Sequence, residues 1–417
     1  MRSFGRAALG LMLATSVLLA SKETAAEGFG FPFGGTEVRF ATFNASLSPF
    51  GEPSLEERLA TPDDPQAKAI AETIQRANPD VLLLNEFDFI ENEGSDSLAL
   101  QRFLENYLAV SQNDAAPIAF DYVFLAPSNT GVPSGFDLDN DGSVGGGNDA
   151  FGFGLYPGHF AMVLLSKYPV LEDQARTFQS FLWKDMPRAL LPEDPATPED
   201  GDWYTPEELE VVRLSSKSHW DVPIDIDGRT VHALVSHPTP PVFDGPEDRN
   251  GTRNHDEIRF WSDYVLPLRG RYIYDDQGRR GGLRFLEPFV VMGDLNADPF
   301  DGESTGDAAR QILRNPLVKR RGTPESEGGV EAAELQGGAN ADHQGDPAFD
   351  TADFGDEAPS PGNLRVDYVL PSLHLKIKRS GVFWPTRDDP LAALVTQSDH
   401  RLVYVDVRVL TGFIFGR

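Results

Sequence analysis

The chain has 417 residues, of which 40% are hydrophobic, and a formal net charge of −29. This length admits two domains, although large α/β folds often use about 250 residues or more as one. The charge opposes nonspecific binding to nucleic acid and to anionic membranes, although bound divalent metals can invert the potential locally. The sequence contains no cysteine, which excludes disulfides, thiolate chemistry and lipid attachment through cysteine.

The N-terminus has the pattern of a secretory signal peptide. Arg2 and Arg6 precede an apolar stretch at 7–20, and small residues at 24–26 offer a cleavage site. The alternative is a buried N-terminal helix. No other segment approaches the length of a membrane-spanning helix, so no stable membrane anchor is expected. We therefore predict a signal peptide at 1–26 and a secreted or periplasmic protein, with a monomer as the expected state.

Helices and strands are predicted to alternate along the chain. Apolar side chains recur at helical spacing in 65–78 and 98–110, and Pro65 suits a first helical turn. Buried strands are predicted where apolar runs are bounded by Gly, Pro or Asp, at 38–44, 81–86, 160–165, 231–237, 289–296, 365–371 and 402–408. This alternation indicates α/β layers and one catalytic domain at about 36–410.

Three long polar insertions interrupt this pattern, at about 126–158, 184–220 and 320–363. Loops of this length are usually functional or disordered, so we expect lids or rims on one core. The acidic, glycine-rich stretch 323–360 is the candidate for mobility. Aromatic residues at 178–183 and 413–415 are open to two interpretations, as membrane contacts or as core.

Polar side chains with metal-binding or proton-transferring groups end several of the predicted strands. They are Asn44, Glu86, His237, Asp294, Asn296, Asp399 and His400. Sheets hold such side chains rigidly, and this set suits metal-assisted attack of water on a phosphate ester.

The tetrapeptide Gly293–Asn296 is the most specific local motif. Glycine allows a sharp exit from the strand, and in extended chain Asp294 and Asn296 point to the same side. Such a pair can position a water molecule and hydrogen-bond a phosphoryl oxygen. Alone, the same tetrapeptide is often a simple turn.

His400 needs an orienting carboxylate if it is to contact phosphate or move a proton. Asp367 is the candidate, because a charged residue inside a buried strand requires a partner. Alternatively, Asp367 caps a turn or pairs with Arg365. Glu86 and Asn44 are oxygen ligands suited to Mg²⁺, Mn²⁺ or Ca²⁺, although Glu86 also fits a solvated strand end.

In this order, these residues resemble the endonuclease/exonuclease/phosphatase superfamily of DNase I-like proteins over nearly the whole mature chain. The resemblance implies a four-layer α/β sandwich, with two packed mixed sheets flanked by helices and the site at one end. It implies that a divalent metal is held by Asn44, Glu86 and Asp399. It further implies that Asp294 orients or deprotonates water, that Asn296 and His237 stabilise the transition state, and that His400, paired with Asp367, contacts phosphate or acts as acid or base.

The sequence departs from the family pattern at two positions. Asn85 precedes Glu86 where many members have glutamine, and His159 lies in an unusual context, which suggests a substrate contact. Arg249 and Arg253 offer a phosphate clamp, and local salt bridges to Asp248 and Glu257 are the alternative.

The segment 137–142 begins like an EF-hand calcium loop. Asp137, Asp139 and Asp141 hold positions one, three and five, and Gly142 holds position six. Asn148 replaces the glutamate of position twelve, although Asp149 follows it. We expect a structural Ca²⁺ here, and a solvated acidic turn is the alternative.

The predicted function is metal-dependent hydrolysis of phosphate esters, mono- or diesters of small or lipid-derived compounds. An extracellular nuclease is the first alternative, disfavoured because no run interleaves basic and aromatic residues as a nucleic-acid surface does. A non-catalytic Ca²⁺-dependent binding protein is the second.

Overall fold

The computed structural model describes residues 34–51, 53–89, 97–197 and 199–410. The predicted signal peptide and the aromatic residues at 413–415 lie outside these ranges. The described residues from Gly34 onward cluster into one unit. No helix among them is long and apolar enough to cross a membrane.

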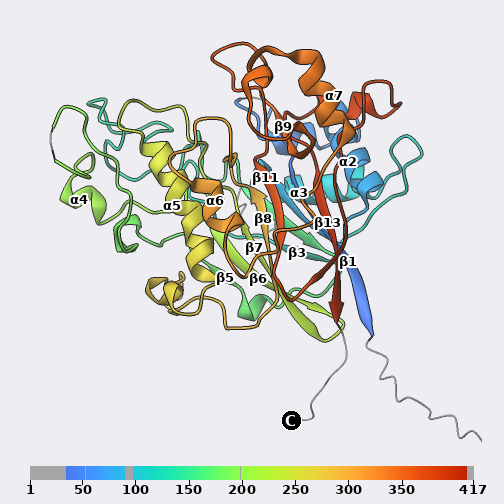
Figure 1. Ribbon diagram of the computed structural model, residues 1–417, viewed down its shortest axis with the longest axis horizontal. Coiled ribbons are helices and arrows are strands. Elements are labelled where there is room, and N and C mark those ends of the chain that lie inside the picture. Colours follow the sequence, from blue (N-terminus) through green and yellow to red (C-terminus); the bar gives the residue numbers. More distant parts are fainter. Residues whose placement is uncertain (1–33, 52, 90–96, 198, 411–417) are drawn as a thin grey trace, which may run out of the picture. The chain divides into compact units, whose positions relative to one another are not determined.

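The first of two large sheets has six strands in the spatial order β12–β13–β1–β2–β4–β3. Figure 1 labels β1, β3 and β13 of this sheet. Only β1 and β2 run parallel, and the other neighbours are antiparallel. The strands are β1 (Gly35–Asn44), β2 (Val81–Asn85), β3 (Tyr122–Phe124), β4 (Met162–Ser166), β12 (Lys376–Val382) and β13 (Val403–Leu410).

The second sheet has five strands in the order β11–β8–β7–β6–β5, and only β7 and β8 run parallel. Its strands are β5 (Arg176–Thr177), β6 (His219–Ile226), β7 (Arg229–Ser236), β8 (Phe289–Asp294) and β11 (Asp367–Pro371). A small separate sheet pairs β9 (Ala352–Asp353) with β10 (Asn363–Leu364).

Both faces of the central strands are buried, which explains their unbroken apolar runs. In β2, Val81 and Leu83 pack between the two sheets, whereas Leu82 and Leu84 pack under helices. The β8 strand alternates in the same way, with Val290 between the sheets. Side chains that alternate along a strand therefore enter two different cores.

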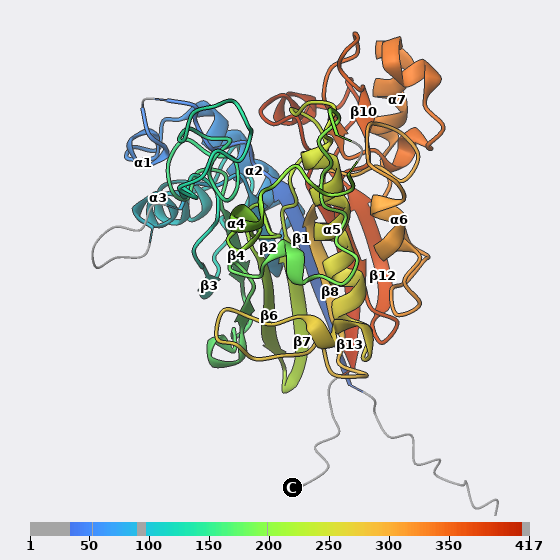
Figure 2. The ribbon, with the colours of Figure 1, turned by 90° about the vertical axis from the view of Figure 1, so that its left-hand side faces the viewer.

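Helices cover the outer face of each sheet, which completes four layers. The first sheet packs against α2 (Pro65–Ala77) and α3 (Leu98–Phe103), and the second against α5 (Arg249–Tyr264) and α6 (Ala308–Leu313). Figure 2 shows α3 and α6 on opposite sides of the strands. The remaining α-helices are α1 (Leu55–Arg58), α4 (Pro206–Leu209) and α7 (Glu327–Gln336). This arrangement confirms the predicted α/β sandwich.

The ends of α2 follow from its sequence. Asp64 accepts a hydrogen bond from the backbone of Ala67, Pro65 occupies the first turn, and Asn78 closes the helix with a left-handed φ of 48°. The second predicted helix is divided, because α3 ends at Phe103 and a π-helical turn, Leu104–Leu108, continues it.

The predicted insertions contain more regular structure than expected. The strand β6 begins at His219, inside the insertion predicted at 184–220, and α7 lies within the one at 320–363. The aromatic residues at 178–183 belong to the core, since Phe178, Phe181 and Trp183 are fully buried. The membrane-contact interpretation of that segment is therefore wrong.

Candidate active site

Strand pairing brings the predicted polar residues to one end of both sheets. In the first sheet, the register places Asn44 opposite Asn85, directly before Glu86. In the second, Asp367 lies opposite Asp294. The parallel pairing of β7 with β8 puts His237, which follows β7, beside the end of β8. Residues from five distant segments therefore share one site.

The backbone takes unusual conformations at this edge. Glu86 and Asn296 have left-handed φ angles of 54° and 50°, which cost free energy for residues other than glycine and are typical of functional sites. The prediction that Asn296 lies in extended chain, on the same side as Asp294, is therefore wrong. Its backbone N–H donates to Oδ1 of Asp294, and its side-chain amide donates to the carbonyl of Pro238.

Gly293 permits a close approach between β7 and β8. A Cβ atom there would lie 1.9 Å from the carbonyl oxygen of Ser236, and the φ of 147° is one that side chains rarely adopt. The strand continues to Asp294, so the sharp exit inferred from the sequence is not the reason for this glycine.

Asn44 joins the two sheets at the centre of the site. Its Nδ2 donates to Oε1 of Glu86 at 3.0 Å and to Oδ2 of Asp294 at 3.1 Å. Its backbone carbonyl accepts a hydrogen bond from Oγ of Ser398 at 2.9 Å, which ties the His400 segment to β1. One asparagine therefore aligns residues from three segments.

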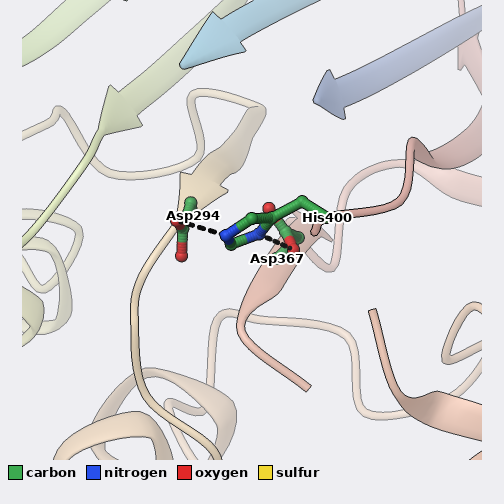
Figure 3. Close-up of side chains that lie close together, drawn as sticks. All are labelled: Asp294, Asp367 and His400. Atoms are coloured by element: carbon green, nitrogen blue, oxygen red, sulfur yellow. Dashed lines mark hydrogen bonds and ion pairs between the residues drawn. The ribbon is translucent and has the colours of Figure 1, made fainter. Parts of the chain in front are cut away.

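His400 lies between two carboxylates (Figure 3). Its Nδ1 donates to Oδ2 of Asp367 at 2.9 Å, and its Nε2 is 3.6 Å from Oδ2 of Asp294. Asp367 is also held by a backbone bond to Oγ1 of Thr351. Asp367 therefore orients the imidazole, and no ion pair with Arg365 forms among the described residues.

The charges of this cluster are coupled. Burial alone would lower the pKa of His400, but the carboxylates of Asp367 and Asp294 raise it to about 10. Burial alone would raise the pKa of Asp294, but His400 and His237 hold it well below its usual range. At neutral pH the cluster therefore pairs an imidazolium with an ionised Asp294.

His237 carries no charge at neutral pH. Its Nε2 is 3.4 Å from Oδ2 of Asp294, and burial together with the nearby charge of Lys217 lowers its pKa to about 4. A neutral imidazole facing an ionised carboxylate donates its Nε2–H.

Lys217 is a candidate site residue that the sequence analysis missed. The register pairs His219 with Ser236, which places Lys217 at the same end of the sheet as His237. It is 7% exposed, and burial lowers its pKa while Glu257, Glu86 and Asp294 raise it. A buried ammonium near these carboxylates can bind a phosphoryl oxygen. Its only signal in the sequence is a lysine among serines, directly before an apolar strand.

The donor atoms of the site fit a hard divalent cation. One ligand atom each from Asp294, Asp367 and His400 lie within 4.8 Å of one another, but the imidazolium of His400 already supplies the positive charge in this group, so a cation would bind beside it, at Glu86. At this site, two buried acceptor atoms lack a hydrogen-bond partner within the described ranges, Nδ1 of His237 and Oδ1 of Asp367. Burial raises the pKa of Glu86, because the ionised carboxylate is poorly solvated there. A bound divalent cation would stabilise the ionised form.

The other predicted metal ligand, Asp399, is exposed at the edge of the cluster. Its charge acts on both Glu86 and His400, which places it near them. The structure thus brings together Asn44, Glu86, His237, Asp294, Asn296, Asp367, Asp399 and His400.

The predicted arginine clamp does not form. Arg253 lies on α5 and donates to the backbone carbonyls of Phe151, Arg213, Leu214 and Ser215. Arg249 lies 3.4 Å from Glu247 and donates to the carbonyl of Leu138. Both guanidinium groups stabilise the insertions, so the clamp hypothesis is wrong and a structural role replaces it.

His159 is buried and does not reach the surface as a substrate contact would. It stacks between Tyr156 and Phe160, at ring-centroid distances of 4.6 and 3.7 Å, and its Nδ1 accepts from the backbone of Leu155. Two exposed aromatic residues extend this stack: Phe50 packs edge-on against His159, and Phe153 stacks on Phe160.

The calcium loop differs from the predicted ligand set. Oxygen atoms of Asp137, Asp139 and Asp149 lie within 4.8 Å of one another, and Asp141 is outside this group. Backbone amides of the loop already donate to all three carboxylates, for example from Asp141 to Asp137 and from Leu138 to Asp149. Calcium binding here stays a prediction.

The fold and this end-of-sheet site define a class of α/β-sandwich proteins. A family model described as Endonuclease/Exonuclease/phosphatase family matches residues 41–400. The chain belongs to this family, whose members are generally metal-dependent phosphoesterases. No curated protein matches the chain.

Solved structures with a similar fold share little sequence. An endonuclease/exonuclease/phosphatase from Beutenbergia cavernae DSM 12333 is 18% identical, with a TM-score of 0.47, over 89% of this chain and 72% of that one. Sphingomyelinase C from Streptomyces griseocarneus is 13% identical, with a TM-score of 0.42, over 89% and 99%. Truncated Caenorhabditis elegans TDP2 is 15% identical, with a TM-score of 0.41, over 89% and 97%. Likeness at this level carries no argument about substrate.

Proposed function

We propose that the protein is an exported, metal-dependent phosphoric ester hydrolase that acts on small or lipid-derived phosphate esters. The observation that carries the proposal is the Asp294 carboxylate, which faces Asn44 of the other sheet and two imidazoles. An ionised carboxylate fixed in this way can accept a hydrogen bond from an attacking water and orient it.

In this mechanism His400 enters as a cation. Asp367 holds its Nδ1–H, so the Nε2–H is directed towards Asp294 and the phosphate that would lie beside it. Lys217 and the amide of Asn296 can donate to phosphoryl oxygens as negative charge develops, whereas His237 can do so only by sharing the Nε2–H that it directs to Asp294. A divalent ion held by Glu86, Asn44 and Asp399, with Mg²⁺ or Mn²⁺ favoured and Ca²⁺ as an alternative, would polarise the phosphoryl group.

Two exposed phenylalanines, Phe50 and Phe153, form an apolar rim that supports a substrate with an apolar group. Phe50 is 70% exposed and Phe153 is 47% exposed. Backbone hydrogen bonds join this rim to the chain after Glu86, from Phe87 to Ala161 and from Phe89 to Gly158. Exposed aromatic residues next to a catalytic centre favour a lipid-derived or aromatic ester over a long polyanion.

Hydrolysis of bis-p-nitrophenyl phosphate, p-nitrophenyl phosphate and plasmid DNA, with each metal and with a chelator, tests the proposal. We expect chelator-sensitive cleavage of a small ester with DNA left intact. Rapid cleavage of DNA would instead favour the nuclease. Inactivity towards all three and towards phospholipids, with every metal, would favour a binding protein and contradict the proposal.

Export is a separate part of the proposal. The N-terminal pattern supports it, and sequencing the N-terminus of protein recovered from the culture medium or periplasm is the test. A mature chain beginning near Glu27 is expected, and retention of the intact N-terminus in the cytoplasm would contradict export.

A further inference from the structure

A pocket of about 280 Å³ lies at the edge of the second sheet, along β11 and beside α6. It is distinct from the candidate active site. The β11 strand presents Asp367 to that site at its first residue, whereas Val369, Leu370 and Pro371 line the pocket. In Figure 2, α6 and β12, which contributes Ile377, are both labelled on the right-hand side.

The walls of this pocket, here called the basic pocket, are strongly cationic. Six of its lining residues carry positive charge: Arg310, Arg314, Lys319, Arg320, Arg321 and Arg365. None of the described residues that line it is acidic, although the chain has 65 acidic residues and 36 lysines and arginines. The basic pocket therefore carries a positive charge, whereas the chain as a whole carries a negative one.

Internal partners compensate only part of this charge. Arg310 and Arg314 share Asp307, at 3.0 and 3.4 Å. Arg365 stacks on the ring of Tyr368, and its Cζ lies 4.8 Å from the ring centroid. Its positive charge also interacts with the carboxyl group of Asp350. No ion pair with a described carboxylate is found for the other three.

Those three residues are Lys319, Arg320 and Arg321. Arg320 donates to the backbone carbonyl of Arg314, which is a neutral partner and not a carboxylate. Like charges held close together repel, and this repulsion is relieved when an anion binds between them. Guanidinium groups suit phosphate in particular, because their planar N–H pairs match two phosphate oxygens.

We propose that the basic pocket binds a small organic anion with at least two phosphate groups, such as a nucleoside diphosphate. The volume is just below the usual range for small-molecule sites, which begins at about 300 Å³, and is larger than a lone ion requires. Leu313, Val369, Leu370 and Ile377 supply an apolar wall against which the organic part can pack. The acidic surface elsewhere opposes a long polyanion. This inference does not depend on the proposed hydrolase function.

Calorimetric titration of adenosine diphosphate into the mature protein, with a chelator present, is the test. The chelator suppresses metal-dependent binding at the candidate active site. We expect saturable one-to-one binding, at least tenfold weaker binding of adenosine monophosphate, and at least tenfold weaker binding of the diphosphate to the double variant Lys319→Glu/Arg321→Glu. Hydrolysis of the small ester should be unchanged in that variant. The neutral double variant Lys319→Gln/Arg321→Gln should give the same direction if charge reversal impairs folding.

The double variant Arg269→Glu/Arg271→Glu is the matched control, because it changes net charge equally at residues outside the pocket. Equal weakening by both double variants would show a general charge effect and overturn the site. Loss of binding in Asp294→Asn would place the ligand in the candidate active site and also overturn it. Absence of saturable binding, or binding of an oligonucleotide or of anionic vesicles without binding of the diphosphate, would overturn the small-ligand assignment.

Discussion

Asn44 and Asp294 belong to different sheets and are joined by one hydrogen bond of 3.1 Å across the sandwich. The geometry of the candidate site therefore depends on the packing of the two sheets. Since Asn44 also holds Glu86, the proposed metal ligand and the proposed water-orienting carboxylate share one support.

Asp294→Asn and His400→Ala should each lower kcat by about 10²–10⁴, because they remove the water-orienting charge and the cationic donor. Both measurements require a folded variant, shown by an unchanged circular dichroism spectrum. A folded variant with wild-type turnover would contradict the assigned roles. The conservative His400→Gln keeps a donor without the charge and should be intermediate.

Lys217→Met should lower kcat/KM by about 10–10³, because it removes a buried cation that faces the phosphate position. It should also move the acidic limb of the pH–rate profile to higher pH, since Lys217 is one of the groups that lower the pKa of His237. Lys167→Met is the control, because Lys167 pairs with Asp80 at the opposite end of β4. An unchanged acidic limb would assign Lys217 a merely structural role.

Removal of metal should abolish hydrolysis, and returning Mg²⁺ or Mn²⁺ should restore it. Binding of metal to the folded state alone should also raise Tm, in proportion to the logarithm of metal concentration. Glu86→Gln should weaken both effects by at least tenfold in metal affinity, because it removes the ligand charge. A metal-dependent Tm unchanged by Glu86→Gln would place the ion elsewhere, for instance in the loop of Asp137.

Acid should destabilise the protein between about pH 6.5 and pH 4 through His219, whose pKa burial lowers to about 4. In this window the unfolded chain binds a proton that the folded protein excludes, so stability falls as pH falls, by up to about 3 kcal/mol. The imidazole is fixed between Oγ of Ser215 and the carbonyl of Glu257. In His219→Gln the pH dependence of the unfolding free energy should decrease by about one proton, and an unchanged slope would refute this account.

The site was largely predictable because its residues end apolar strands. Asn44, Glu86 and Asp294 follow runs whose length and composition indicate burial, and parallel pairing then brings such ends together. Lys217 was not predictable, because it lies inside the insertion predicted at 184–220, directly before the start of β6. The prediction of an arginine clamp was wrong for a related reason. The local sequence shows the charge of Arg253 but not the distant backbone carbonyls to which its guanidinium group donates.

The fold was predictable where strands are buried on both faces and not where they lie at an edge. The strand β12 carries lysine and arginine and was missed, although such charge is typical of edge strands protected against pairing with other chains. The helix α7 contains two buried glycines, Gly328 and Gly329, which are poor helix formers, and only its tertiary contacts reveal it.

The missing side chain at Gly293 sets a spacing that chemistry depends on. At Gly293 the backbone of β8 packs directly against the backbone of β7 at Ser236. This close backbone contact holds the next residues along the two strands, His237 and Asp294, at their short distance. The side chain of any other residue at this position would push the two strands apart. The imidazole of His237 would then move away from the carboxylate of Asp294, although neither residue had been substituted. The tolerance of this protein to substitution should therefore be lowest at a position that has no functional group at all.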